Sequence, residues 1–114
     1  MLKYSHLTDK QKSEITNGCG GKGMGFEPPQ FFFKASCNHH DFYYWRGGEA
    51  KDRRYADTAF LDAMLEDAER ALTFYGRAFN KIAACAYYLV VRLGGKKYFN
   101  FGPMKTQKDL PSRY

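Results

Sequence analysis

A short stretch near the middle of the chain, Cys37-Asn38-His39-His40-Asp41-Phe42-Tyr43-Tyr44, concentrates side chains that can do chemistry. On a helix, residues three or four positions apart share a face. His40 and Tyr44 would therefore point one way, while Cys37 and Asp41 line an adjacent stripe. A neutral imidazole can accept a proton from water near about pH 7, and a carboxylate beside it can hold a hard cation. The stretch predicts a helix that carries a base next to a cation ligand.

The spacing of four of these residues resembles the active-site helix of secreted phospholipase A2, whose pattern is Cys-Cys-x-x-His-Asp-x-Cys-Tyr. The matching positions are a cysteine, the His-Asp pair and a tyrosine, namely Cys37, His40, Asp41 and Tyr44. Ser36 and Tyr43 stand where the family has two further cysteines. Two of the family's disulfides are therefore missing from this chain.

Two other segments extend the resemblance in the same chain order. Upstream, Asn17-Gly18-Cys19-Gly20-Gly21-Lys22-Gly23 resembles the family's glycine-rich calcium loop around Cys-Gly-x-Gly. Downstream, Ala56-Asp57-Thr58-Ala59-Phe60 is similar to the Ala-Asp-x-x-Phe of the compact phospholipase A2 domains of parvovirus capsids. The three motifs cover residues 17–60 of a 114-residue chain, whose length predicts one domain, 1–114. The resemblance implies a small all-α phospholipase A2-like fold with two antiparallel active-site helices, a glycine-rich calcium loop and a further C-terminal helix.

The resemblance also implies a role for each side chain of the expected site. His40 would be the general base that deprotonates a water for attack on the sn-2 ester of a glycerophospholipid. Asp57 would accept the other ring N–H and stabilise the imidazolium, and Tyr44 would hydrogen-bond Asp57 to keep it placed. The backbone N–H of Gly20 matches the family's donor to the oxyanion.

Calcium is the cofactor that the resemblance implies. Its ligands would be carboxylate and carbonyl oxygens, with waters completing the shell: both oxygens of Asp41 and the backbone carbonyls of Gly18, Gly20 and Lys22. The ion would polarise the scissile carbonyl and bind the phosphate. Because this chain has Cys19-Gly20-Gly21-Lys22-Gly23 where the family has Cys-Gly-x-Gly-Gly, the ligand assigned to Lys22 is fixed only to within one residue.

Capping and turn residues predict the first helices. Thr8 and Gln11 fit a capping box and predict a short helix over residues 8–16. Ser36 is the expected N-cap of the helix that carries the motif, and Gly47-Gly48 is its expected end. The motif residues would thus lie on a helix of about three turns.

The next helix is predicted to begin near residues 49–52. Apolar residues recur at intervals of three and four from Phe60 to Leu72, and Asp57 heads this inward-facing stripe. A buried carboxylate needs a partner, and His40 on the preceding antiparallel helix is the natural one. We therefore predict that a ring nitrogen of His40 lies within about 3 Å of an Asp57 oxygen.

The C-terminal half is predicted in less detail. Gly76 is expected to break the long helix, and a third helical segment should continue to Leu93 and end at Gly94-Gly95. Residues 96–101 allow a short extended piece, and residues 102–114 are expected to be irregular. The aromatic run 31–33 ahead of the motif helix could fill the core, line an acyl slot or meet a membrane, and the sequence leaves this open.

Composition and charge limit the class of protein. The chain is 44% hydrophobic and 18% aromatic, which excludes a disordered chain. Its net charge of +6 favours acidic partners, which means anionic lipid surfaces or nucleic acid. Together with the resemblance to phospholipase A2, this positive charge makes a phospholipid membrane surface the favoured partner. No secretion signal is evident, and the longest apolar stretch is too short to span a bilayer. We therefore expect a soluble or peripheral protein. If it leaves the cell, we expect it to do so without a leader or to be carried in a virion.

The three cysteines leave at least one unpaired. The resemblance implies a disulfide between Cys19 and Cys37, whereas the lack of a leader favours reduced thiols, so both states stay open. Cys85 lies among small residues and is expected to be free and packed in a helix interface.

Other interpretations of the same residues remain. A phospholipase-like domain that has lost activity could still bind membranes or a partner. A small nucleic-acid-binding module would explain the charge but leaves the spacing of the histidine and the two aspartates unexplained. His39 is a second possible base, but it is interpreted as an exposed neighbour because Asp41 directly follows His40. A zinc site is disfavoured because adjacent residues do not converge on one tetrahedral ion: Cys37, His39, His40 and Asp41.

Overall fold

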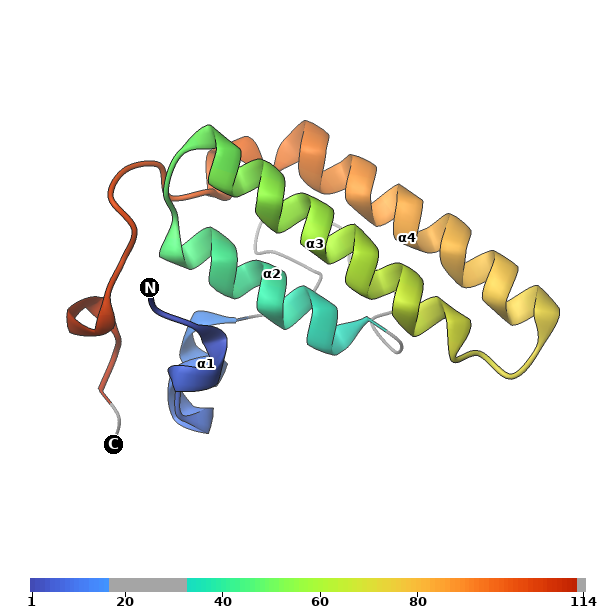
Figure 1. Cartoon of the computed structure of the whole chain (residues 1–114), viewed down its shortest axis with the longest axis horizontal. Coiled ribbons are helices and arrows are strands. Elements are labelled where there is room, and N and C mark those ends of the chain that lie inside the picture. The colour runs from blue at the N-terminus through green and yellow to red at the C-terminus, as the bar shows by residue number, and fades with distance from the viewer. Residues whose placement is uncertain (17–32, 113–114) are drawn as a thin grey trace.

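The computed structural model describes residues 1–16 and 33–112, and within these ranges the chain is built from helices. The α-helices, shown in Figure 1, are α1 (Asp9–Ile15), α2 (Lys34–Arg46), α3 (Ala50–Glu69) and α4 (Phe74–Gly94). Three short 3-10 turns lie outside them: η1 (Tyr4–His6), η2 (Lys96–Tyr98) and η3 (Gln107–Asp109). The described ranges contain no strand, so the prediction of an all-α fold is confirmed.

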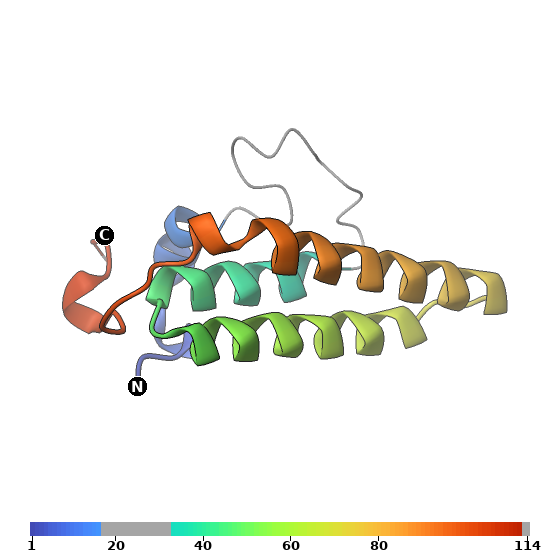
Figure 2. The same ribbon diagram turned by 90° about the horizontal axis from the view of Figure 1, so that it is seen from above.

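The three long helices lie side by side and alternate in direction, with α3 in contact with both α2 and α4. Figure 2 shows the same arrangement from above. The short helix α1 packs against α2. The prediction that the motif helix and the next helix are antiparallel neighbours is therefore confirmed. The helix that follows them, α4, covers α3.

The connection between α2 and α3 depends on two glycines. Gly47 has a φ of +76° and Gly48 a φ of +133°, which are conformations that residues with a side chain rarely adopt. A Cβ on Gly47 would also collide with the backbone carbonyl of Asn100. The predicted helix end is thus confirmed, and the tight turn sets the register of α3 against α2.

We predict that Gly47→Ala lowers the free energy of unfolding by about 1–3 kcal/mol, because the new methyl group adds backbone strain and a clash with Asn100. Gly94→Ala is the matched control, since nothing lies within 4 Å of the position of its Cβ. Urea unfolding followed by circular dichroism measures both variants. Equal midpoints for the two would show that this turn does not need its glycines.

Side-chain caps are found at the starts of α1 and α3, and the first of them was predicted. At α1, the Thr8 hydroxyl accepts a hydrogen bond from the Gln11 N–H at 3.2 Å, and the Gln11 side chain accepts one from the Thr8 N–H at 2.9 Å. At α3, the side chain of Asp52 accepts a hydrogen bond from the N–H of Glu49, the N-cap residue, at 2.8 Å. Both helices begin where the sequence predicted.

The predicted N-cap of α2 is wrong. The helix begins at Lys34 and its N-cap is Phe33, which makes no side-chain capping bond. Ser36 lies in the first turn and is buried, and its hydroxyl donates to Asp67 Oδ2 of α3 at 2.7 Å. The hydroxyl therefore fastens α2 to α3 instead of capping its own helix.

The predicted break at Gly76 is also wrong. The chain turns earlier, between Glu69 and Phe74, and Gly76 lies in the first turn of α4. There its N–H donates to the hydroxyl of Thr73, the N-cap of α4, at 2.9 Å. Because α3 ends before Leu72, this residue leaves the inward stripe and is 98% exposed.

The main core lies where α3 meets the start of α2 and the middle of α4. The buried side chains are supplied by all three helices and by the residue before α2: Phe33, Cys37, Phe60, Met64, Ala84 and Tyr87. Phe33 of the aromatic run is thus a core residue, and the other two members of the run lie outside the described residues.

Cys85 is free, as predicted, but it is exposed, so the prediction that it packs in a helix interface is wrong.

The C-terminal residues run back past the α2–α3 turn. Residues 96–98 form η2 rather than an extended piece, and a single bridge joins Phe101 to Gly48. Residues 102–112 are irregular as predicted, apart from η3, and the Gln11 side chain donates to the carbonyl of Pro111 at 3.0 Å. Among the described residues, no helix has the length and apolar character needed to cross a bilayer.

Candidate active site

His40 of α2 and Asp57 of α3 face each other between the two helices. His40 Nε2 lies 2.7 Å from Asp57 Oδ1, which confirms the predicted pairing. Both side chains are buried. The contact arises because each residue sits on the inward face of its own helix, and the short glycine turn places these faces together.

The rings of Tyr44 and Phe60 both contact the imidazole of His40. The ring of Tyr44, one turn after His40 on α2, lies 4.2 Å from the imidazole between centroids, and the ring of Phe60 lies 4.5 Å away and stacked. The Tyr44 hydroxyl also donates to Asp57 Oδ1 at 2.6 Å, as predicted. The aromatic contacts therefore restrict the ring orientation of His40, while the hydroxyl restricts the carboxylate.

Two arginines that the motif comparison did not identify complete the surroundings of Asp57. Arg92 of α4 donates through Nη1 to Asp57 Oδ2 at 2.6 Å. Arg53 of α3 donates through Nε to the Tyr44 hydroxyl at 3.2 Å, and its Nη2 reaches the carbonyls of Val91 and Arg92 at the end of α4. The arginines thus tie α4 to the His40–Asp57 pair.

The hydrogen bonds decide the ionisation of Asp57. Burial by itself raises the pKa of this carboxyl, but hydrogen bonds from His40, Tyr44 and Arg92 outweigh burial and lower it. Burial also raises the pKa of the Tyr44 hydroxyl, and its bond to Asp57 raises it further. At neutral pH the centre therefore holds a carboxylate and a protonated phenol.

The ionised carboxylate fixes which ring nitrogen of His40 is available. When the imidazole is neutral, its Nε2–H donates to Asp57, so the lone pair lies on Nδ1. No described residue makes a hydrogen bond to Nδ1. The geometry thus equips His40 to accept a proton at Nδ1 while Asp57 stabilises the imidazolium that results.

The lowered pKa of Asp57 predicts a specific pH dependence of stability. A carboxyl whose folded pKa lies below its unfolded value stabilises the fold above the unfolded value, about pH 4, and this stabilisation is lost as the pH falls through the folded pKa. We expect the free energy of unfolding to fall with acidification below about pH 4. Asp57→Asn should flatten this slope, whereas Glu69→Gln, which removes an exposed partner of Lys81, should leave most of it. An unchanged slope in Asp57→Asn would contradict the assignment.

The other base considered from the sequence, His39, is exposed as expected. Its ring contacts that of Tyr4 near the N-terminus, with 4.1 Å between centroids. Partial burial lowers its pKa, and the positive charge of Lys12 lowers it further. His39 therefore belongs to a different surface from the Asp57 centre.

The expected calcium ligands are only partly described. Asp41 is half-buried on α2, directly after His40. The loop positions lie outside the described residues: Gly18, Cys19, Gly20 and Lys22. Within the described ranges, no three side chains of His, Cys, Asp or Glu are grouped so that they could hold a metal ion. Because calcium takes six to eight oxygen ligands, Asp41 fits the chemistry but needs carbonyl or water partners.

Only one of the two cysteines of the expected disulfide lies within the described residues. Cys37 is buried in the main core at the start of α2, and Cys19 lies outside the described residues. The pairing of these two cysteines stays a prediction.

The sequence contains a signal for the contact of Arg53 with the site but none for that of Arg92. Arg53 precedes Asp57 by four residues on one helix, a spacing that favours ion pairs and could have identified it. Arg92 is separated from Asp57 by 35 positions and belongs to no motif. Its contact depends on how α4 packs against α3.

Comparisons with known proteins identify no family for this chain. No family model matches it, no curated protein is significantly similar, and no solved structure is a significant match. The functional conclusion therefore depends on the residues and their geometry.

Proposed function

We propose that this chain hydrolyses the sn-2 acyl ester of glycerophospholipids in a calcium-dependent reaction, within a small phospholipase A2-like fold. The observation that carries the proposal is the buried His40–Asp57 pair across α2 and α3, with Tyr44 bonded to the same carboxylate oxygen. A chance helical His-Asp motif would not require a second aspartate 17 residues later to meet the imidazole.

In the proposed reaction, His40 Nδ1 takes a proton from a water as that water attacks the ester carbonyl. Asp57 keeps Nε2 protonated and stabilises the imidazolium, and Tyr44 keeps Asp57 in place. As the tetrahedral intermediate collapses, the imidazolium gives its proton to the leaving alkoxide of the glycerol backbone. The products are a fatty acid and a lysophospholipid, and His40 is neutral again.

Calcium would polarise the ester carbonyl and offset the negative charge that develops on its oxygen. Asp41 lies one residue after the proposed base, so an ion that it binds would be close to the reacting ester. The backbone carbonyls of Gly18, Gly20 and Lys22 are proposed as its other protein ligands, and the N–H of Gly20 as the oxyanion donor.

A second candidate function follows from Arg92. This guanidinium donates to Asp57 Oδ2 at 2.6 Å and therefore offsets part of the negative charge that would stabilise a protonated His40. A chain with this feature could retain the fold and bind membranes without hydrolysis. We favour the enzyme because Oδ1 remains directed at the imidazole and Tyr44.

The proposal predicts release of fatty acid from mixed micelles of a phospholipid labelled at sn-2. We expect release by the purified protein with calcium, loss of release in excess chelator, and recovery when calcium is restored. A phospholipid labelled at sn-1 is the matched control and should release no label. Equal release with chelator, or release from sn-1 alone, would contradict the mechanism. No release under any condition would favour the inactive membrane-binding domain.

A further inference from the structure

Helix α4 exposes a row of apolar side chains on the side opposite its buried residues Asn80, Ala84 and Tyr87. The row, called the outer stripe, follows alternating spacings of four and three: Tyr75, Phe79, Ile82, Ala86, Leu89 and Leu93. Its five large side chains are between 56% and 87% exposed. Single exposed apolar residues are normal, but a continuous row along a whole helix indicates an interaction surface.

The apolar surface is wider than the stripe alone. Phe74 and Cys85 are exposed on one flank of it, and Leu72 is exposed just before the helix. A seam for one partner helix is narrow and bordered by charges of both signs. A broad apolar face with aromatic and leucine side chains is typical of a helix that lies in a lipid interface.

The charges near the stripe have one sign. Helix α4 contains Arg77, Lys81 and Arg92 and no acidic residue. Lys81 pairs with Glu69 of α3 and Arg92 with Asp57, so these charges are partly offset within the molecule.

Lys96 and Lys97 follow α4 directly and are exposed. A second copy of α4 would bring further positive charge to this surface, whereas an anionic lipid surface supplies the opposite charge.

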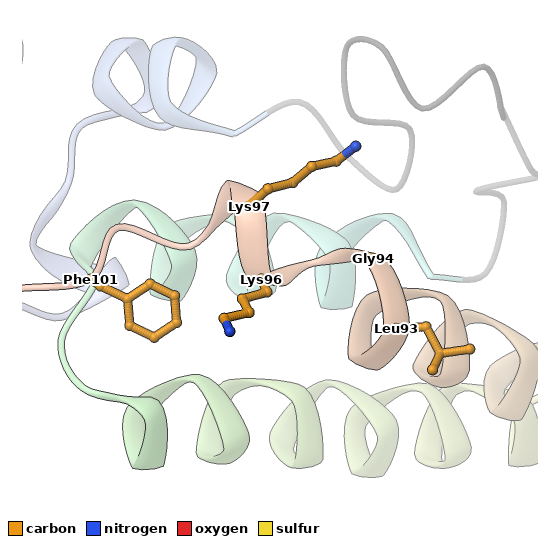
Figure 3. Close-up of a pocket in the computed structure, with 5 residues that line it drawn as sticks. All are labelled: Leu93, Gly94, Lys96, Lys97 and Phe101. Carbon is orange, nitrogen blue, oxygen red and sulfur yellow. The ribbon is translucent and has the colours of Figure 1, made fainter.

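A hollow of about 520 Å³ lies where the stripe ends, lined by Leu93, Gly94, Lys96, Lys97 and Phe101. Figure 3 shows Lys96 and Phe101 extending into the same space beside the end of α4, while Lys97 extends away from them. The hollow combines apolar walls with the ammonium group of Lys96. Such a lining suits a lipid headgroup whose phosphate meets a lysine while its glycerol region meets the apolar side chains.

We propose that the outer stripe and the two lysines after it form a docking surface for an anionic phospholipid bilayer, with α4 lying in the plane of the interface. The stripe buries its side chains at the level of the acyl-chain boundary, Lys96 contacts a phosphate at the hollow, and Lys97 adds positive charge beside it. The surface is separate from the His40–Asp57 pair and does not require hydrolysis. Its partner is the bilayer itself, whether or not the lipid is a substrate.

The test is sedimentation of the full chain with vesicles in the presence of chelator. One set of vesicles contains equal phosphatidylglycerol and phosphatidylcholine, and the other phosphatidylcholine alone. The stripe variant carries Phe79→Ser and Ile82→Ser, and the charge variant carries Lys96→Gln and Lys97→Gln. Tyr55→Ser is the matched control, because Tyr55 is a similarly exposed aromatic residue on α3. Circular dichroism checks that each variant is folded.

We expect the protein to bind the anionic vesicles more strongly than the neutral ones. The stripe variant should lower the partition coefficient by at least about tenfold for both vesicles, because two buried apolar side chains are lost. The charge variant should lower it by about tenfold on anionic vesicles only. Tyr55→Ser and His40→Gln should bind as the unaltered chain does, so a failure of catalysis and a failure of docking are distinguishable.

Two results would overturn the proposal. One is binding by the stripe variant equal to that of the unaltered chain. The other is a chain that does not sediment with either vesicle; if gel filtration then shows a dimer that Phe79→Ser and Ile82→Ser dissociate, the stripe is an interface between two copies.

Discussion

Replacing His40 by glutamine is expected to lower the rate of sn-2 fatty-acid release by roughly 10²- to 10⁴-fold, the usual contribution of a positioned general base. The glutamine amide can still donate to Asp57, so the helix pair keeps its contact and the loss reports on proton transfer. Release of labelled fatty acid at saturating calcium measures the effect. Far-UV circular dichroism and a thermal scan of the same preparation exclude unfolding as the cause.

His39→Gln is the control for this experiment. His39 precedes His40, is exposed and contacts Tyr4 rather than the Asp57 centre. We expect its activity to stay within about twofold of the unaltered chain, as for most surface substitutions. The opposite ranking of the two variants would mean that the base has been assigned to the wrong histidine.

Asp57→Asn is expected to have the second large effect, on stability as well as on activity. The substitution keeps the size of the side chain but removes the negative charge that Arg92 contacts at 2.6 Å. The Arg92 guanidinium and the Tyr44 hydroxyl then have no carboxylate partner. Breaking a buried ion pair from one side costs about 3 kcal/mol or more in the free energy of unfolding. Fatty-acid release should also fall, because the asparagine can no longer fix the tautomer of His40 or stabilise the imidazolium.

The partner of Asp57 can be tested with a double-mutant cycle. Asp62→Asn, an exposed aspartate on the same helix, is the matched control and should change the free energy of unfolding by less than about 0.5 kcal/mol. Adding Arg92→Gln to Asp57→Asn should recover part of the lost stability, because it removes the uncompensated cation. Additive losses in the double variant would show that Arg92 and Asp57 do not interact as described.

The helix pair and its central contact could be predicted from the sequence because they depend on local rules. Helical spacing sets Tyr44 one turn from His40, and the two glycines fix a short antiparallel connection. Asp57 stands at the head of an apolar stripe, where a lone carboxylate needs a partner on the facing helix. These constraints together determine one pairing, which the structure contains.

Features that depend on competition between partners could not be predicted in this way. Ser36 has the right type and place for an N-cap, but its hydroxyl bonds to Asp67 on another helix. Arg92 reaches Asp57 only because α4 packs against α3. Such tertiary contacts leave no periodic signal in one sequence.

The outer stripe of α4 could not be predicted from the sequence for a related reason. Apolar residues occur on both sides of this helix, so their spacing predicts a helix without showing which side is buried. Tyr87 lies in the core, whereas Phe79 and Ile82 are exposed. The calcium ligands proposed at Gly18, Gly20 and Lys22 lie outside the described residues and stay a prediction.

The central claim is that Asp57 holds His40 through Nε2 and leaves Nδ1 to act as the base. Nitrogen-15 NMR of the imidazole side chains tests this most directly, because protonated and unprotonated ring nitrogens of neutral histidine have clearly different shifts. We expect neutral His40 to carry its proton on Nε2, with Nδ1 unprotonated, and Asp57→Asn to weaken this preference. A neutral His40 with its proton on Nδ1 would contradict the account, because the nitrogen assigned to take the proton from water would have no lone pair to offer.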